Sequence, residues 1–158
     1  MPRFKPVILP ALTLLAGFAL AACSMGGGGA PTGLAPGLSA RMDQPGATLD
    51  RVQAIGLINA YRATNGLPPL TPDPALDGTA QALASQYAQT GTPPRMPQEL
   101  SGMKLSAGYA TFADTFSGWR NSPADAVALR ASATKAGIAM AFNGTSSYGI
   151  HWVLVLDD

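Results

Sequence analysis

The stretch LINAYRATNGLPPLTPDPALDGTAQALASQYA, from Leu57 to Ala88, carries the clearest structural pattern in the chain. It contains the end of one amphipathic segment, a loop with four prolines and an alanine-rich segment. Asp73 is a good N-cap residue, and Pro74 suits the first position of a helix. Apolar residues then recur at helical spacing, so we predict a helix from Pro74 to about Thr90.

A second helix is predicted immediately before the proline-rich loop. Apolar side chains recur every three or four residues between Leu49 and Tyr61, which places them on one helical face. Thr48 can cap the start of this helix, and Gly66 suits its end.

The remaining elements follow an irregular segment over residues 91–109. A short helix is predicted over residues 112–120, and Ser122 can cap a further helix that runs to about Ala133. The apolar runs at residues 136–142 and 150–156 predict an antiparallel hairpin at the C-terminal end. We therefore expect an α+β fold. About four helices and a small antiparallel sheet, which includes this hairpin, would form an α-β-α sandwich.

The first 22 residues have the pattern of a secretory signal peptide. Arg3 and Lys5 precede the apolar run VILPALTLLAGFALAA. The sequence LAAC, ending at Cys23, is similar to the bacterial lipobox, whose cysteine is lipidated and becomes the first mature residue. The alternative is an ordinary signal peptide followed by an unrelated cysteine. Cys23 is the only cysteine of the chain, so it has no partner for an internal disulfide.

Composition predicts how the mature chain is organised. Residues 23–47 are rich in Gly, Pro, Ala and Ser without apolar periodicity, so we expect a flexible tether there. One folded domain is then expected over residues 48–158, because 158 residues with a hydrophobic fraction of 47% suffice for one core.

The charge balance excludes some partners. Removal of residues 1–22 takes away Arg3 and Lys5 and leaves eight basic side chains against nine acidic ones. No nucleic-acid partner is expected, and no basic patch is available to hold anionic lipid. Membrane attachment would therefore rest on the lipid of Cys23. The expected location is the bacterial cell envelope, with the domain outside the cytoplasm.

The stretch from Leu57 to Ala88 resembles the opening of bacterial CAP-superfamily domains. This superfamily includes cysteine-rich secretory proteins, antigen 5 proteins and plant pathogenesis-related proteins. GWRNSP, from Gly118 to Pro123, is similar to the family's G-W-x-N-S-P turn, and the last two apolar runs are similar to its closing strands. The matching positions in the opening stretch are Asn59, Arg62, Gly66, Leu70, Asp73, Pro74 and Leu76.

The resemblance also implies a cavity that this sequence does not reproduce. Family members often carry two histidines and one or two glutamates there, associated in some with a divalent metal. The segment TGTPPRMPQ, where the first histidine is expected, has none, and Asp125 stands at the position of the second. Met103 stands at the position of a glutamate. No metal site can be carried over residue by residue, and no cofactor is expected.

Two titratable residues remain candidates for a site. Asp125 could bind a metal or act as an acid, but one carboxylate lacks the convergent partners that either role needs. Its structural interpretation is a helix-capping residue at the third position of its helix. His151 is the only histidine, and it is adjacent to Trp152 in a predicted strand. If Trp152 faces the core, His151 faces the other side of the sheet, for packing or a hydrogen bond.

A cluster of aromatic residues also allows two interpretations. Tyr109, Phe112, Phe116 and Trp119 either line a groove for an apolar or saccharide ligand or belong to the core.

Three functions are compatible with these observations. The first is a membrane-anchored lipoprotein whose degenerate CAP-like domain binds an envelope lipid, glycan or protein without catalysis. The second is a metal-assisted hydrolase or protease-like enzyme, which would need Asp125, Asp114 and His151 to converge. The third is a lipid carrier, which would need an open apolar groove around Phe112, Phe116 and Met103.

Overall fold

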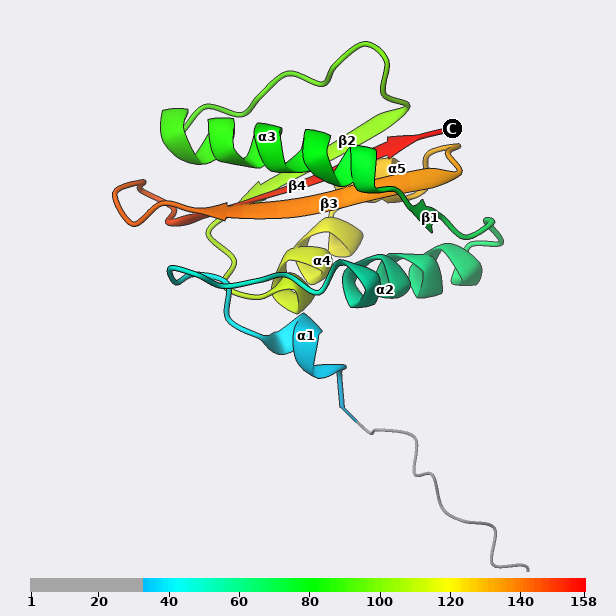
Figure 1. Cartoon of the computed structure of the whole chain (residues 1–158). Coiled ribbons are helices and arrows are strands. Elements are labelled where there is room, and N and C mark those ends of the chain that lie inside the picture. Colours follow the sequence, from blue (N-terminus) through cyan, green and yellow to red (C-terminus); the bar gives the residue numbers. More distant parts are fainter. Residues whose placement is uncertain (1–32) are drawn as a thin grey trace, which may run out of the picture. The chain divides into compact units, whose positions relative to one another are not determined.

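A four-stranded sheet forms the centre of the computed structural model, which describes residues 33–158 (Figure 1). The strand order is β1-β3-β4-β2. β2, β3 and β4 pair antiparallel, whereas the two-residue β1 pairs in parallel with β3. The predicted C-terminal hairpin is confirmed as β3 and β4, and the sheet is mixed. The bounds are β1 Thr71–Pro72, β2 Gly102–Ala107, β3 Lys135–Phe142 and β4 Ile150–Asp157.

Helices cover both faces of this sheet, which confirms the predicted α-β-α sandwich. α3 covers one face, and α2, α4 and α5 lie on the other, with α1 packed against α2 and α4 (Figure 1). The described residues therefore contain one helix more than the four predicted. The bounds are α1 Pro36–Ser39, α2 Arg51–Thr64, α3 Pro74–Thr90, α4 Phe112–Asn121 and α5 Pro123–Leu129.

Alternation along β4 produces two hydrophobic cores. Trp152 and Leu154 belong to the core shared with α2 and α4, whereas Val153 and Val155 belong to the core under α3. Successive side chains of a strand point to opposite faces, so one buried strand serves both layers.

The N-terminal cap of α3 agrees with the sequence prediction, whereas that of α2 differs from it. α3 begins as predicted, because the Asp73 carboxylate accepts a hydrogen bond from the backbone N–H of Ala75 at 2.7 Å. The expected capping of α2 by Thr48 is wrong. Asp50 is the N-cap, and its carboxylate accepts from the backbone N–H of Gln53 at 2.9 Å.

The segment from residue 36 to residue 47, expected to belong to the tether, packs on the domain instead. Leu38 and Met42 are only 6% and 2% exposed and belong to the core. The backbone N–H of Met42 donates to the carbonyl of Ala110 at 2.8 Å. These two apolar residues and the hydrogen bonds of the segment, including one from the Gly37 N–H to the Gln53 Oε1 at 2.9 Å, hold it on the domain, although its composition shows no periodicity. The predicted signal peptide and Cys23 lie outside the described residues.

Two further boundaries differ from the sequence prediction. The segment expected to be irregular contains the edge strand β2, whose residues GMKLSA have weak strand propensity and are held by pairing with β4. α5 ends at Leu129 rather than near Ala133. The chain leaves the helix there because the carbonyls of residues 129, 131 and 133 turn toward the side chain of Arg62.

Arg62 joins three parts of the chain from a fully buried position. Its guanidinium donates to the carbonyls of the proline-rich loop and of the segment between α5 and β3. The acceptors and distances are Pro68 at 3.0 Å, Leu129 at 3.1 Å, Ala131 at 2.9 Å and Ala133 at 3.4 Å. One helix turn earlier, the Asn59 amide donates to the carbonyl of Leu70 at 2.9 Å and accepts from its N–H at 2.8 Å. These two side chains therefore fix the path of the chain into β1 and into β3.

Gly137 sets the approach of α3 to the sheet. A Cβ atom at this position would lie 2.1 Å from the backbone carbon of Leu76, which no side-chain rotation can relieve. Gly78, on α3 itself, is exposed, and a Cβ atom there would have nothing within 4 Å.

Gly137→Ala should destabilise the domain strongly, because α3 must move away from β3 to admit the methyl group. We expect a loss of about 3 kcal/mol in the free energy of unfolding, as for overpacked cores. The control Gly78→Ala should instead raise stability by roughly 0.5–1 kcal/mol, since alanine favours a helix interior. Urea unfolding measures both. Equal effects of the two substitutions would contradict the close contact.

Arg62→Met should also lower the free energy of unfolding, by about 3 kcal/mol, because several buried carbonyls lose their donor. The control is Arg95→Met at an exposed position, which should change stability by less than about 0.5 kcal/mol. The same urea titration tests the pair, and a mild effect of Arg62→Met would show that these carbonyls find other donors.

Candidate functional site

The turn between α4 and α5 brings Asp125 to Lys104 of β2. Ser122 ends α4 and begins α5, which places Asp125 in the first turn of α5. The Asp125 carboxylate accepts a hydrogen bond from the Lys104 Nζ at 2.6 Å. The Ser122 side chain makes no capping hydrogen bond to α5, so the expected capping of this helix by Ser122 is wrong. Asp125 is therefore engaged in an ion pair across the layer between α5 and the sheet.

This ion pair determines the protonation of Asp125. The hydrogen bond from Lys104 lowers the Asp125 pKa, partial burial opposes the shift, and the Lys104 charge and the Ser122 hydroxyl add to the lowering. The carboxylate is thus held ionised and already has a cation as its partner. A general acid needs the opposite shift, toward a raised pKa.

Met103 points away from this pair, to the other face of the sheet. It packs against the core under α3 and also lines an open cleft of about 460 Å³ along the edge strand β2. Met96 and Val127 line the same cleft and are among the exposed large apolar side chains of the domain. At the position where the resemblance implies a glutamate, the site is therefore apolar.

His151 is fully buried under α3, on the face of the sheet opposite to Trp152. Its ring packs edge-on against Tyr87, with the two centroids 4.6 Å apart, and its Nε2 lies 3.3 Å from the Ser146 Oγ. Burial lowers the His151 pKa, and the nearby backbone carbonyl of Ala141 opposes this shift. The His151 Nδ1 is buried without a hydrogen-bond partner among the described residues. His151 is thus a neutral ring that packs in the core.

The other candidate residues have structural contacts. Asp114 is exposed in the first turn of α4, where its carboxylate accepts from the Thr111 hydroxyl at 2.8 Å. Trp119 is 2% exposed, and its Nε1 donates to the carbonyl of Leu105 at 3.1 Å. Tyr109 is 43% exposed. Of the aromatic cluster, only Tyr109 is open to solvent.

The three residues that an enzyme would need are not gathered into one site. His151 lies under α3, whereas α4 and α5, which carry Asp114 and Asp125, lie on the opposite face of the sheet. Among residues 33–158, no group of three or more His, Cys, Asp or Glu side chains is placed to hold a metal ion.

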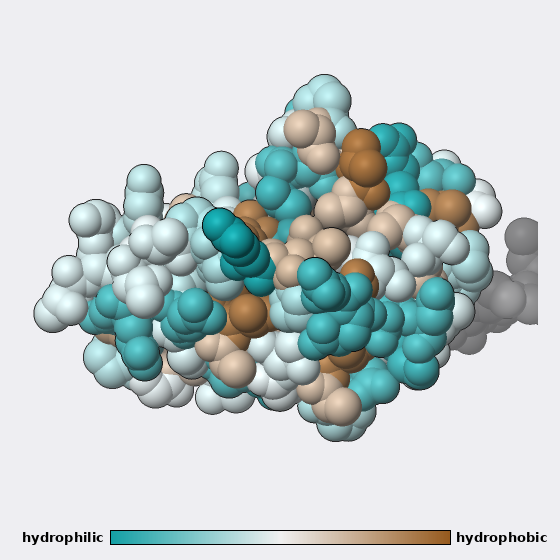
Figure 2. Space-filling view, turned by 90° about the horizontal axis from the view of Figure 1, so that it is seen from above, coloured by the Kyte–Doolittle hydropathy of each residue, from teal (hydrophilic) through white to brown (hydrophobic). Residues whose placement is uncertain are grey.

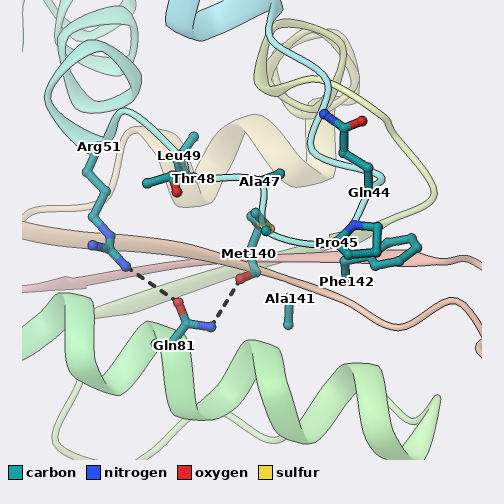
Figure 3. Close-up of a pocket in the computed structure, with 11 residues that line it drawn as sticks. Gln44, Pro45, Ala47, Thr48, Leu49, Arg51, Gln81, Met140, Ala141 and Phe142 are labelled. Carbon is teal, nitrogen blue, oxygen red and sulfur yellow. Dashed lines mark hydrogen bonds between the residues drawn. The ribbon is translucent and has the colours of Figure 1, made fainter.

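A cleft of about 530 Å³ that the sequence analysis did not identify lies at the outer edge of β3 (Figure 3). The segment from Gln44 to Leu49 forms one wall, and Gln81 of α3 forms part of the other. Arg51 reaches in from α2 and donates to the Gln81 Oε1 at 3.4 Å, and Gln81 in turn donates to the carbonyl of Met140 at 3.1 Å. Sequence reasoning missed this cleft partly because residues 44–47 of this wall were assigned to the tether.

The surface on the α3 side is mixed in polarity. Figure 2 looks onto this side and shows mostly weakly apolar surface near the centre, bordered by polar side chains. Among the described residues, no helix is both long and apolar enough to cross a bilayer.

Comparison with known proteins identifies the family of this chain. Residues 55–156 match the profile of the CAP, or cysteine-rich secretory protein, family, and the chain belongs to that family. A search of curated proteins gives no match.

Solved structures are similar to it at low sequence identity. An outer surface protein from Borrelia burgdorferi has a TM-score of 0.54 and 19% identity, covering 65% of this chain and 88% of that one. The crystal structure of MpPR-1i has a TM-score of 0.53 and 20% identity, covering 66% and 82%. At these identities the likeness concerns the fold.

The Lys104–Asp125 pair makes a prediction about pH. Because its pKa is lowered on folding, Asp125 contributes stability that is present above its ordinary value of 3.8 and is lost as the pH falls through the lowered value. Asp125 is about one third exposed, so solvent screening limits this contribution to about 0.5 kcal/mol.

Lys104→Met should raise the Asp125 pKa toward its ordinary value. NMR titration of the side-chain carboxyl measures this, with Lys135→Met as the control. An unchanged pKa in Lys104→Met would contradict the pairing.

Proposed function

We propose that this protein is a bacterial envelope lipoprotein, anchored through a lipid on Cys23, whose CAP domain binds an envelope component without catalysis. The observation that carries the non-catalytic assignment is the Lys104–Asp125 ion pair. It occupies the carboxylate that stands where the family resemblance implies a cavity histidine. A carboxylate with a lysine partner and a lowered pKa is suited to structure rather than to proton transfer.

The anchoring rests on the sequence around Cys23. The LAAC motif is similar to a lipobox, and Cys23 is the only cysteine of the chain. The similarity to an outer surface protein of Borrelia burgdorferi supports a location at the cell surface or in the envelope. The near balance of charge in the mature chain argues for an envelope lipid, glycan or protein as the ligand rather than nucleic acid.

The two alternative functions have less support. A metal-assisted hydrolase or protease-like enzyme would need His151 and Asp125 on the same side of the sheet. A lipid carrier would need Phe112 and Phe116 to line a groove. Phe112 is fully buried in the core, and Phe116, at 4% exposure, lines only a cleft of about 250 Å³ beside Leu57. The cleft of about 460 Å³ beside Met103 is the larger of these two apolar openings.

Native mass spectrometry of the full chain, released from membranes in detergent, tests the proposal. We expect the mass of the mature chain plus lipid covalently bound to Cys23, unchanged when zinc or calcium is offered. The variant Cys23→Ser should lose the lipid and leave the membrane fraction, whereas the control Ser24→Ala should keep both.

Three results would count against the proposal. Retention of the lipid mass in Cys23→Ser would show that Cys23 is not the site of lipid attachment. A stoichiometric metal that disappears in Asp125→Ala or His151→Ala would favour the enzyme. A lipid that co-purifies without a covalent bond would favour the carrier.

A further inference from the structure

The outer edge of β3 is only partly paired. β1 pairs with Lys135 and Ala136 alone, so the edge from Ile138 to Phe142 has no neighbouring strand in the described chain. Alternate residues of an antiparallel strand direct their backbone groups to the same side. The backbone N–H of Asn143 donates to the carbonyl of Gly149 at 2.7 Å and continues the β3–β4 ladder. The backbone N–H and C=O groups of the odd-numbered β3 residues therefore point toward β4. The backbone groups of residues 138, 140 and 142 point outward, away from β4.

Side chains replace the missing strand over the first part of this edge. The Asp77 carboxylate accepts from the N–H of Ile138 at 2.9 Å, and the Arg51 Nε donates to the carbonyl of Ile138 at 2.9 Å. The Gln81 amide then donates to the carbonyl of Met140 at 3.1 Å (Figure 3). The replacement stops there. The N–H of Met140 and both backbone groups of Phe142 have no hydrogen-bond partner among residues 33–158.

The cleft of about 530 Å³ lies against this free part of the edge. Met140, Ala141 and Phe142 line it, opposite the segment from Gln44 to Leu49. Arg51 is the only charged residue among the described residues that line it. Its side chain is 40% exposed, and its Nε lies 3.7 Å from the Asp77 carboxylate. That contact and the hydrogen bonds to Ile138 and Gln81 use Nε and one Nη2 hydrogen, so the Nη1 donors at the far end of the guanidinium have no partner among the described residues. The cleft thus offers a strand edge beside a cation.

We propose that this cleft binds an extended segment of a protein partner, which adds as a strand to β3 and places a carboxylate side chain on Arg51. The inference rests on the proposed binding function and names its partner class. A peptide backbone supplies N–H and C=O groups at the spacing of the free edge, and strand addition is an established mode of peptide recognition. A glycan or lipid headgroup could reach Arg51 but would not continue the ladder. The carboxylate follows from charge complementarity with Arg51.

The experiment measures binding of fluorescein-labelled hexapeptides to the full chain in detergent, by fluorescence anisotropy. The probes alternate valine and threonine, with one glutamate moved through each position in turn. We expect at least one position to bind. Replacing its glutamate by glutamine should weaken binding about tenfold. N-methylation of the alternate peptide nitrogens that would face β3 should weaken binding at least as much. N-methylation of the other alternate nitrogens, which would point away from β3, is the matched control.

Two pairs of variants locate the binding. Phe142→Pro removes only the outward N–H, which edge strands tolerate, whereas Phe142→Ala keeps it. Phe142→Pro should bind at least about tenfold more weakly than Phe142→Ala. Arg51→Gln should abolish the preference for glutamate over glutamine, and Arg51→Lys should keep part of it. Thermal unfolding by circular dichroism verifies that each variant is folded, and the methylated peptides test the ladder without any variant.

Several outcomes would overturn the inference. One is the failure of every probe peptide to bind. Another is equal binding of the two N-methylated forms of the peptide. The third is equal affinities of Phe142→Pro and Phe142→Ala for the peptide. The anchored binding function would still stand if the same chain kept its lipid on Cys23. Loss of that lipid in wild-type protein, with the peptide still bound, would instead overturn the proposed function and leave the strand edge in place.

Discussion

The buried guanidinium of Arg62 is the interaction on which the rest of the fold depends. It collects carbonyls from the proline-rich loop and from the segment that leads into β3. Burial lowers its pKa, so the cost of burying the charge has to be offset by these hydrogen bonds. Because the bonds determine where α5 ends and where β3 begins, they also position the hairpin against which α3 and β2 pack.

Local patterns in the sequence predicted the parts of the fold that local forces decide. The α3 helix follows from the Asp73 cap, the proline after it and a regular apolar stripe, and the β3–β4 hairpin follows from two apolar runs. β2 and the packed segment at Met42 were missed because neither has a pattern of its own. β2 is held by its pairing with β4, and Met42 by a core that forms only when the domain is assembled.

The candidate site shows the same division. The family resemblance implies cavity positions at Asp125 and Met103. It did not reveal that Lys104 pairs with Asp125, or that the neighbouring side chains of Met103 and Lys104 point to opposite faces of the sheet. That information comes from the pairing register of β2 with β4. The cleft at the edge of β3 depends on Arg51, Gln81 and Met140, which are far apart in the chain, so no spacing in the sequence could reveal it.

If the domain is anchored through Cys23 as proposed, the packing of Leu38 and Met42 has a mechanical consequence. Tension along the chain would load the contacts of α1 with α2 and α4 before it reached the sheet. These contacts involve few side chains, whereas β4 is paired along its length on both sides. Under load, the segment up to Met42 would peel away first and lengthen the connection to the anchor, while the sheet and its two cores stayed intact.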